Sequence, residues 1–256
     1  MIYLYGLAAA EPAKLAYILD GVQGLQGPLQ FAAIGPWTLV FSDHDDQEIL
    51  PKRRLLLAHT KVLETILPLC TVLPARFGLV AGDLPQVAKL VTDHTAQIAA
   101  QFAKVTGAVE VGLRVSFPRQ AALEAALHSS KSLQEQQAKL RKSGPEAHFA
   151  IAAFGGRLAE LVDQRRGDAQ RSLLAALRPL ARDHVLRAPD DDTQVLRAEF
   201  LIDEVTLPAF QDQVSTLAAE LDFAPKAEPL IQVIGPVPMY HFVRLNLGLE
   251  LDQAAA

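Results

Sequence analysis

The spacing of hydrophobic residues along the chain predicts short strands alternating with amphipathic helices. Residues 108–117 are the clearest strand, because apolar and polar positions alternate along them. Residues 51–67 and 83–105 instead repeat apolar side chains every three or four positions, which is typical of a helix with one buried face. Asp83 is placed to cap the second helix. Further strands are predicted at residues 2–7, 29–34, 37–42, 72–74, 184–187, 195–205 and 230–234, and further helices at residues 8–20, 119–142, 146–183 and 208–222.

This order of elements predicts an α+β protein in three parts. Residues 1–117 are expected to form a ferredoxin-like α+β domain with one insertion, because long helices on one face of an antiparallel sheet bury the apolar side of each layer. Residues 118–183 are expected to form a helical hairpin segment, interrupted or closely packed at Gly155-Gly156 and broken near Gly167 and Pro179. Residues 184–256 are expected to form a small C-terminal α+β portion, which packs with the helical segment, and a tail.

The run Val72-Leu73-Pro74-Ala75-Arg76-Phe77-Gly78 lies between the two long helices predicted in the first part. It is expected to be a short buried strand followed by a turn. Arg76 is the polar residue that needs an explanation there. We expect it to be internal and paired with Glu64 or Glu110, because a desolvated guanidinium needs an acidic partner. The alternative is that Arg76 contacts a partner protein or an anion.

This run, together with the helix before it, resembles the GvpL/GvpF family of gas vesicle accessory proteins. In that family a helix with H-x-x-V-L-E precedes V-L-P-x-R-F-G, as His59 to Glu64 precede the run here. Tyr3-Leu4-Tyr5-Gly6 resembles the family's N-terminal strand, and Gly107-Ala108-Val109-Glu110 its G-x-x-E segment. Residues 235–243 are similar to a family ending G-P-W-P-P-Y-x-F-V, with Val237 and Met239 at two departures. The resemblance marks His59, Glu64, Leu73, Pro74, Arg76, Phe77, Gly78, Glu110, Gly235, Pro236 and Tyr240 as structural or partner-binding residues.

The resemblance implies an accessory or minor structural protein that binds the amphipathic gas vesicle shell protein and assists gas vesicle assembly. Its other expected partners are gas vesicle accessory proteins, and it implies no catalysis, cofactor or metal. The alternative is a small-molecule-binding enzyme or sensor built on a ferredoxin-like scaffold. A deep polar pocket holding Arg76 would favour that alternative, whereas exposed apolar surface or an open sheet edge would favour the assembly role.

Composition narrows the function classes further. The chain has 256 residues and a net charge of −5, which argues against non-specific nucleic-acid binding. No 18-residue apolar run predicts a membrane span, so a soluble, cytoplasmic protein is expected. The single cysteine excludes an intrachain disulfide. The motifs G-x-S-x-G, H-E-x-x-H and the P-loop do not occur, and the turn Asp190-Asp191-Asp192 is expected to hold no ion.

Two segments keep alternative interpretations. Lys52-Arg53-Arg54, at the start of a predicted helix, is either a solvated basic cluster or a patch for an acidic protein. Residues 235–238 contain two prolines, so they are expected to leave the sheet as an extended linker. The residues after them either fill the core of the C-terminal portion or fold back onto the N-terminal domain.

Overall fold

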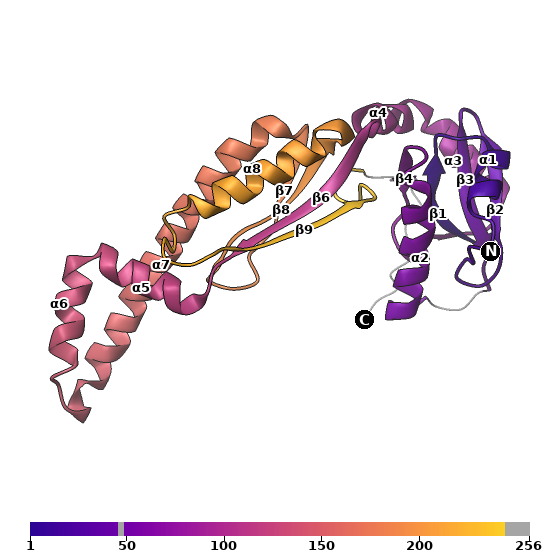
Figure 1. Cartoon of the computed structure of the whole chain (residues 1–256). Helices are drawn as coiled ribbons and strands as arrows, with labels where there is room; N and C mark the ends of the chain where they lie inside the picture. The colour runs from indigo at the N-terminus through magenta and orange to yellow at the C-terminus, as the bar shows by residue number, and fades with distance from the viewer. Residues whose placement is uncertain (46–48, 244–256) are drawn as a thin grey trace. The chain divides into compact units, whose positions relative to one another are not determined.

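The computed structural model describes residues 1–45 and 49–243 (Figure 1). They form two compact units, the first comprising Met1–Glu110 with residues 236–243 and the second comprising Val111–Gly235. The elements up to residue 105 are β1 (Ile2–Ala8), α1 (Pro12–Ile18), β2 (Leu29–Ile34), β3 (Trp37–Asp43), α2 (Arg53–Ile66), β4 (Val72–Pro74), β5 (Val80–Ala81), α3 (Leu84–Asp93) and α4 (Thr95–Val105). The later elements are β6 (Ala108–Ser116), α5 (Arg119–Ser129), α6 (Lys131–Leu140), α7 (His148–Leu177), β7 (Asp183–Leu186), β8 (Gln194–Asp203), α8 (Leu207–Ala219) and β9 (Leu230–Val237), with short 3-10 helices at Pro145–Ala147, Arg178–Leu180 and Glu204–Thr206.

The first unit is built on a sheet with the strand order β2-β3-β1-β4, and β5 also pairs with β1. β1 runs antiparallel to β3, β4 and β5, and β2 runs antiparallel to β3. The succession β1-α1-β2-β3-α2-β4 with this strand order is the ferredoxin-like arrangement. The predicted α+β class, with a ferredoxin-like N-terminal region, is therefore confirmed.

The core of the first unit surrounds β1, which is buried at all seven positions. Tyr3 and Tyr5 share a buried cluster with Leu15 of α1 and Leu63 of α2. Elsewhere in the unit, the Trp37 ring of β3 stacks on Phe102 of α4, with centroids 5.4 Å apart. A central strand that is buried along its whole length needs helices on both faces of its sheet, and these helices supply them.

A β-bulge and a glycine bring β1 and β4 into close contact. The register of β1 against β3 shifts between Leu4 and Gly6, which places one extra residue in β1. Gly6 lies opposite Pro74, and a Cβ atom at Gly6 would approach the Leu73 carbonyl oxygen to 2.4 Å. Only glycine therefore allows β4, and the turn after it, to approach β1 this closely.

The second unit repeats the same strand connectivity. Its sheet has the order β7-β8-β6-β9, so the first of its four strands again lies between the third and the fourth. The helices α5, α6 and α7 together occupy the place that α1 has in the first unit, and α8 occupies the place of α2. Figure 1 shows α7 and α8 beside this sheet, and both α7 with α8 and α7 with β8 are in contact.

The structure corrects the place of β6. Its alternating pattern was expected to complete the first sheet, as the last strand of residues 1–117, but β6 pairs within the second sheet, between β8 and β9. Alternation identifies a strand and its buried face, whereas the identity of its neighbours depends on residues far away in sequence. Whether residues 1–117, 118–183 and 184–256 act as separate domains stays a prediction.

The interruption or close packing expected at Gly155-Gly156 and the break expected near Gly167 are wrong, whereas the break expected near Pro179 is confirmed. α7 runs unbroken through Gly155, Gly156 and Gly167. A glycine costs a helix about 1 kcal/mol, whereas proline is the residue that breaks one, and α7 ends just before a 3-10 turn containing Pro179. Two further breaks, which the pattern did not indicate, divide the helices expected at residues 83–105 and 119–142: one lies at His94, between α3 and α4, and the other at Ser130, whose hydroxyl caps α6.

Candidate functional site

The family-motif residues of β1, α2 and the turn after β4 meet in a buried polar cluster of the first unit. The Gly78 backbone N–H donates to the Tyr3 hydroxyl over 3.2 Å, and that hydroxyl lies 2.8 Å from Nδ1 of His59. The Tyr3 hydroxyl and His59 Nδ1 share one hydrogen bond, and the ring nitrogen of His59 that carries the proton decides which of the two donates. The sequence brings these three residues together through β1, α2 and a glycine with φ +86°.

His59 is held in its neutral form by this environment. The residue is 2% exposed, and burial lowers the pKa of His59 to about 4, although the nearby backbone of Ala75 opposes the shift. Burial also raises the pKa of the Tyr3 and Tyr5 hydroxyls. The cluster therefore carries no charge at neutral pH, and its chemistry suits packing rather than proton transfer to a substrate.

Aromatic contacts extend the cluster to Phe77, within the run of residues 72–78. Phe77 meets the edge of His59 with ring centroids 5.8 Å apart, and the Tyr5 ring stacks on His59 at 5.6 Å. The Tyr5 hydroxyl accepts from the Leu25 backbone N–H and bonds with Ser42. These contacts hold the V-L-P-x-R-F-G segment against both β1 and α2. Leu73 and Pro74 of the same segment are buried as well.

Arg76 does not have the environment that its place in the sequence led us to expect. Its side chain is exposed, and it forms no ion pair with any residue that the structure describes. Glu64 is exposed too, and Glu110 has a different partner. The chain leaves β4 so that Phe77 turns toward the cluster, which directs Arg76 outward. The internal, paired Arg76 is wrong, and the alternative, a contact for a partner or an anion, stays a prediction.

Glu110 instead anchors the C-terminal segment within the first unit. This carboxylate is 1% exposed and accepts from the His241 backbone N–H at 2.9 Å. Its other oxygen lies 2.6 Å from His241 Nδ1. A buried carboxylate needs such donors, so the G-x-x-E motif and the C-terminal motif, 131 residues apart, are parts of one arrangement.

The rest of the C-terminal segment packs around this anchor. Residues 238–243 form tight turns, in which the Val243 N–H donates to the Met239 carbonyl at 3.1 Å. Met239, Phe242 and Val243 are buried, and the Lys104 ammonium lies 5.7 Å from the centre of the Phe242 ring. Burial raises the pKa of Tyr240 to about 12, and its hydroxyl is hydrogen-bonded to Thr60 of α2.

This arrangement decides between the two alternatives for the chain end. The described C-terminal residues pack on the first unit and do not fill the core of the C-terminal portion. The linker predicted at residues 235–238 is wrong, because β9 continues through Gly235 and Pro236 to Val237. Gly235, the residue before Pro236, has φ +130°, a backbone conformation that glycine adopts readily, and the strand continues through it.

The second unit offers an open sheet edge. β9 is the last strand of its sheet and pairs on one side with β6, and no described strand pairs with its other side. The sequence of β9, Leu-Ile-Gln-Val-Ile-Gly-Pro-Val, carries no charge. Leu230 is 60% exposed and Ile234 is 41% exposed. This edge combines unpaired backbone groups with exposed apolar side chains, and the family motifs mark only its last residues.

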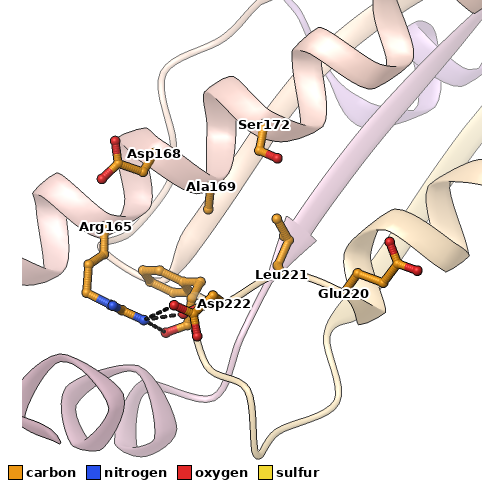
Figure 2. Close-up of a pocket in the computed structure, with 8 residues that line it drawn as sticks. Arg165, Asp168, Ala169, Ser172, Glu220, Leu221 and Asp222 are labelled. Atoms are coloured by element: carbon orange, nitrogen blue, oxygen red, sulfur yellow. Dashed lines mark hydrogen bonds and ion pairs between the residues drawn. The ribbon is translucent and has the colours of Figure 1, made fainter. Parts of the chain in front are cut away.

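A polar cleft in the second unit is centred on Arg165 of α7 (Figure 2). The cleft holds about 340 Å³, and a neighbouring cavity of about 390 Å³ shares Arg165 and Asp222 with it. The Arg165 guanidinium donates to the Asp222 and Phe223 carbonyls and pairs with the Asp222 carboxylate. Arg165 therefore holds Asp222 and Phe223, which follow α8, against α7. No sequence motif indicated this residue, and Arg76 lines neither cavity.

Two further features of the described residues bear on function. The acidic turn is closed by its own side chains: Asp191 accepts from the Thr193 hydroxyl and backbone, which lowers the pKa of Asp191. Arg119 pairs with Asp192 and Arg197 with Asp190. No helix among the described residues has the length and apolar character needed to cross a bilayer.

Comparison with known proteins places the chain among gas vesicle proteins. A family model described as gas vesicle synthesis protein GvpL/GvpF matches residues 1–244. Gas vesicle protein F of Microcystis aeruginosa is 30% identical over 220 residues, which cover 84% of this chain and 88% of the relative. Gas vesicle protein F of a Streptomyces species is 26% identical over 243 residues, covering 94% and 98% of the two chains.

Solved structures agree with this assignment. The crystal structure of GvpF from Microcystis aeruginosa matches with a TM-score of 0.72 and 27% identity, over 95% of this chain and 99% of that one. GvpF from Anabaena has the same fold, with a TM-score of 0.79 at 24% identity, over 95% and 98% of the two chains. Because the family model spans nearly the whole chain and the fold agrees throughout, the chain belongs to the GvpL/GvpF family of gas vesicle synthesis proteins.

Proposed function

We propose that this chain is an accessory or minor structural protein of gas vesicles, which binds their amphipathic shell protein and assists its assembly. Family membership supports the gas vesicle setting, and the open β9 edge is the structural observation that carries the binding role. A subunit with an apolar face aggregates unless that face is covered before assembly. A sheet edge covers it with both backbone hydrogen bonds and apolar side chains.

β9 lacks most of the features that protect a natural sheet edge. Such edges usually carry lysine or other charges, or are very short. β9 has eight residues, none of them charged, and its only protective feature is the Gly235-Pro236 pair near its end. An edge that stays unprotected in this way suits the addition of a strand from a partner, with its apolar side chains beside Leu230 and Ile234.

The proposed role is non-catalytic, and contacts with other gas vesicle accessory proteins and a cytoplasmic location at gas vesicles belong to the same proposal. A deep polar pocket holding Arg76 would have favoured the rival, an enzyme or sensor. Arg76 is exposed instead, and the buried His59 is neutral and engaged with Tyr3. Both observations favour the assembly role.

A pull-down with purified shell protein tests the edge. We expect the double variant Leu230→Lys/Ile234→Lys to retain about tenfold less shell protein, equivalent to ~1.4 kcal/mol, because two ammonium groups would flank any added strand. Both side chains are already exposed, so the sheet itself should remain folded. Circular dichroism of the variant checks that point.

The opposite edge of the same sheet provides the matched control. Leu186 of β7 is 46% exposed, so Leu186→Lys places one lysine on the other edge strand, against the two lysines of the β9 variant. We expect this variant to bind shell protein like the unaltered chain. Equal retention by the β9 double variant would show that the β9 edge is not the binding surface.

A further inference from the structure

The solvent-facing side of α2 combines exposed cations with an exposed leucine. Residues 49–63 contain four lysines and arginines and no acid, in a chain whose net charge is −5. All four cations are exposed, and none forms an ion pair with a residue that the structure describes: Lys52, Arg53, Arg54 and Lys61. Leu57, among them in the sequence, is 58% exposed. The local charge is therefore opposite to that of the whole molecule.

The helix period places the cations around Leu57. Arg53 and Lys61 lie four residues before and after Leu57, and Arg54 lies three residues before it, so all three are its neighbours on one face. The opposite face holds the buried residues of α2 and packs on the first sheet, beside β1 and β4 (Figure 1). The exposed Glu64, seven residues after Leu57, is the acid at the far end of the face.

The start of α2 adds to the positive potential of this face. The first turn of the helix contains no acid, and Lys52 at the N-cap position makes no capping hydrogen bond with its side chain. A helix N-terminus carries a partial positive charge, so three cations at this end are electrostatically unfavourable. A carboxylate placed here is attracted both by the cations and by the helix end.

A small hollow adjoins the same cations. It holds about 150 Å³, and its lining includes Lys52, Arg54 and Leu50, which is itself 47% exposed. This volume is well below the roughly 300–1,000 Å³ of a small-molecule site. The hollow therefore suits one side chain of a larger partner, and its two cations select a carboxylate.

We propose that the face of α2 formed by Arg53, Arg54, Leu57 and Lys61, with the hollow beside Leu50, binds an acidic amphipathic segment of another protein. The carboxylates of that segment pair with the cations, and its apolar side chains cover Leu57. The inference goes beyond the proposed function, because this face belongs to the first unit and binds its partner whether or not the β9 edge binds the shell protein.

Other anionic or apolar occupants fit the face less well. Nucleic acid engages cations through its phosphates and leaves an exposed leucine at the centre of the contact without a role. A helix that lies on a bilayer presents a continuous apolar side, whereas Leu57 stands alone among cations. A second copy that paired symmetrically through this face would bring the same cations together. An acidic segment with apolar side chains uses both features of the face.

Fluorescence anisotropy with synthetic peptides tests the proposal on the full chain. The probe is a labelled helical peptide of about five turns, with leucine on one face and glutamate on both flanks. One matched peptide carries lysine in place of glutamate, and another carries serine in place of leucine. We expect the first probe to bind at least about tenfold more tightly than either matched peptide, and its binding to weaken as salt is added.

Arg53→Glu separates binding from folding. Glutamate in the first turn of a helix is favourable, so the melting temperature should not fall, whereas binding of the glutamate–leucine probe should weaken about tenfold. Leu57→Gln should weaken the binding at least about threefold, because it removes the apolar contact and keeps the charge. The control is Lys14→Glu, the same change of charge on α1 near Cys70, past the other end of α2. It should keep the binding within about twofold.

Equal losses in Arg53→Glu and Lys14→Glu would overturn the proposal, because the probe would then respond only to the charge of the whole chain. Equal binding of the serine peptide, or equally tight binding of a single-stranded DNA oligomer, would make the face a general polyanion site instead. Arg53-dependent binding to anionic vesicles without binding of the probe would assign it to lipid. An Arg53-dependent dimer in sedimentation, again without binding of the probe, would assign it to a second copy.

Discussion

At the scale of single residues, the family motif combines buried and exposed positions with different physical roles. His59, Tyr3 and Gly78 form one hydrogen-bonded chain in the core, whereas Arg76, two residues before Gly78, faces solvent. The buried imidazole of His59 packs in the core, and it contributes to the stability of the fold only while it is uncharged. An exposed arginine in the same motif carries its charge at little cost and is available to a partner.

The low pKa of His59 predicts that the first unit loses stability in mild acid. The pKa of His59 is about 4 in the folded chain against an ordinary value of 6.5, so between these values the unfolded chain binds one more proton. Stability is then fully present above pH 6.5 and falls as the pH drops toward 4. The loss is about 3 kcal/mol at most.

Urea unfolding followed by the fluorescence of Trp37, the single tryptophan of the chain, measures this effect. His59→Gln should be less stable at pH 7 and should lose less of its stability between pH 6.5 and 4. Identical pH slopes for the two proteins would mean that His59 does not carry the acid sensitivity.

At the scale of elements, the contact between β1 and β4 depends on a missing side chain. Gly6→Ala would place Cβ 2.4 Å from the Leu73 carbonyl oxygen, so one of the two strands must shift. We expect a loss of about 1–3 kcal/mol in the free energy of unfolding, as for other overpacked cores. Denaturant unfolding monitored at Trp37 gives the value.

A glycine-to-alanine substitution in α7 serves as the comparison and should raise the stability instead of lowering it. Gly156→Ala meets nothing within 4 Å, so it should stabilise the helix by about 1 kcal/mol. Because Trp37 lies in the first unit, thermal unfolding followed by far-UV circular dichroism is the measurement here. Similar effects of the two substitutions would remove the steric explanation for Gly6.

At the scale of the whole molecule, the chain returns at its C-terminal end to the unit in which it began. Glu110 and His241 are the polar contact, and Met239 and Phe242 are the apolar one. The first unit therefore contains two segments that are distant in sequence. We therefore expect the stability of the first unit to depend on residues 238–243.

Truncation tests this dependence. A chain ending at Val237 lacks both His241 donors, so it leaves the Glu110 carboxylate buried without them, and it loses the burial of Phe242. We expect the first unit to lose at least about 3 kcal/mol, judged by Trp37 fluorescence during urea unfolding. A chain ending at Val243 keeps every described contact of the segment and is the reference. If both chains unfold at the same urea concentration, the C-terminal segment contributes no stability to the first unit.

Local pattern was sufficient for most elements of this protein. The strands at residues 29–34, 72–74 and 108–116 and the Asp83 cap follow from side-chain period and capping chemistry, which act within a few residues. The ferredoxin-like order of the first sheet follows from the succession of those elements. The family motifs identified the residues that meet around Tyr3 and His59, although not how they are bonded.

Only the tertiary structure decided the sheet to which β6 belongs, the exposure of Arg76 and the pairing of Glu110 with His241. Each depends on which distant segments meet, and alternation or charge type in one segment carries no information about its partner. The exposure of Phe149 has the same origin: it is 87% exposed although it lies in an uncharged helical stretch, because the first half of α7 buries no side chain and runs with α6 beyond the end of the sheet.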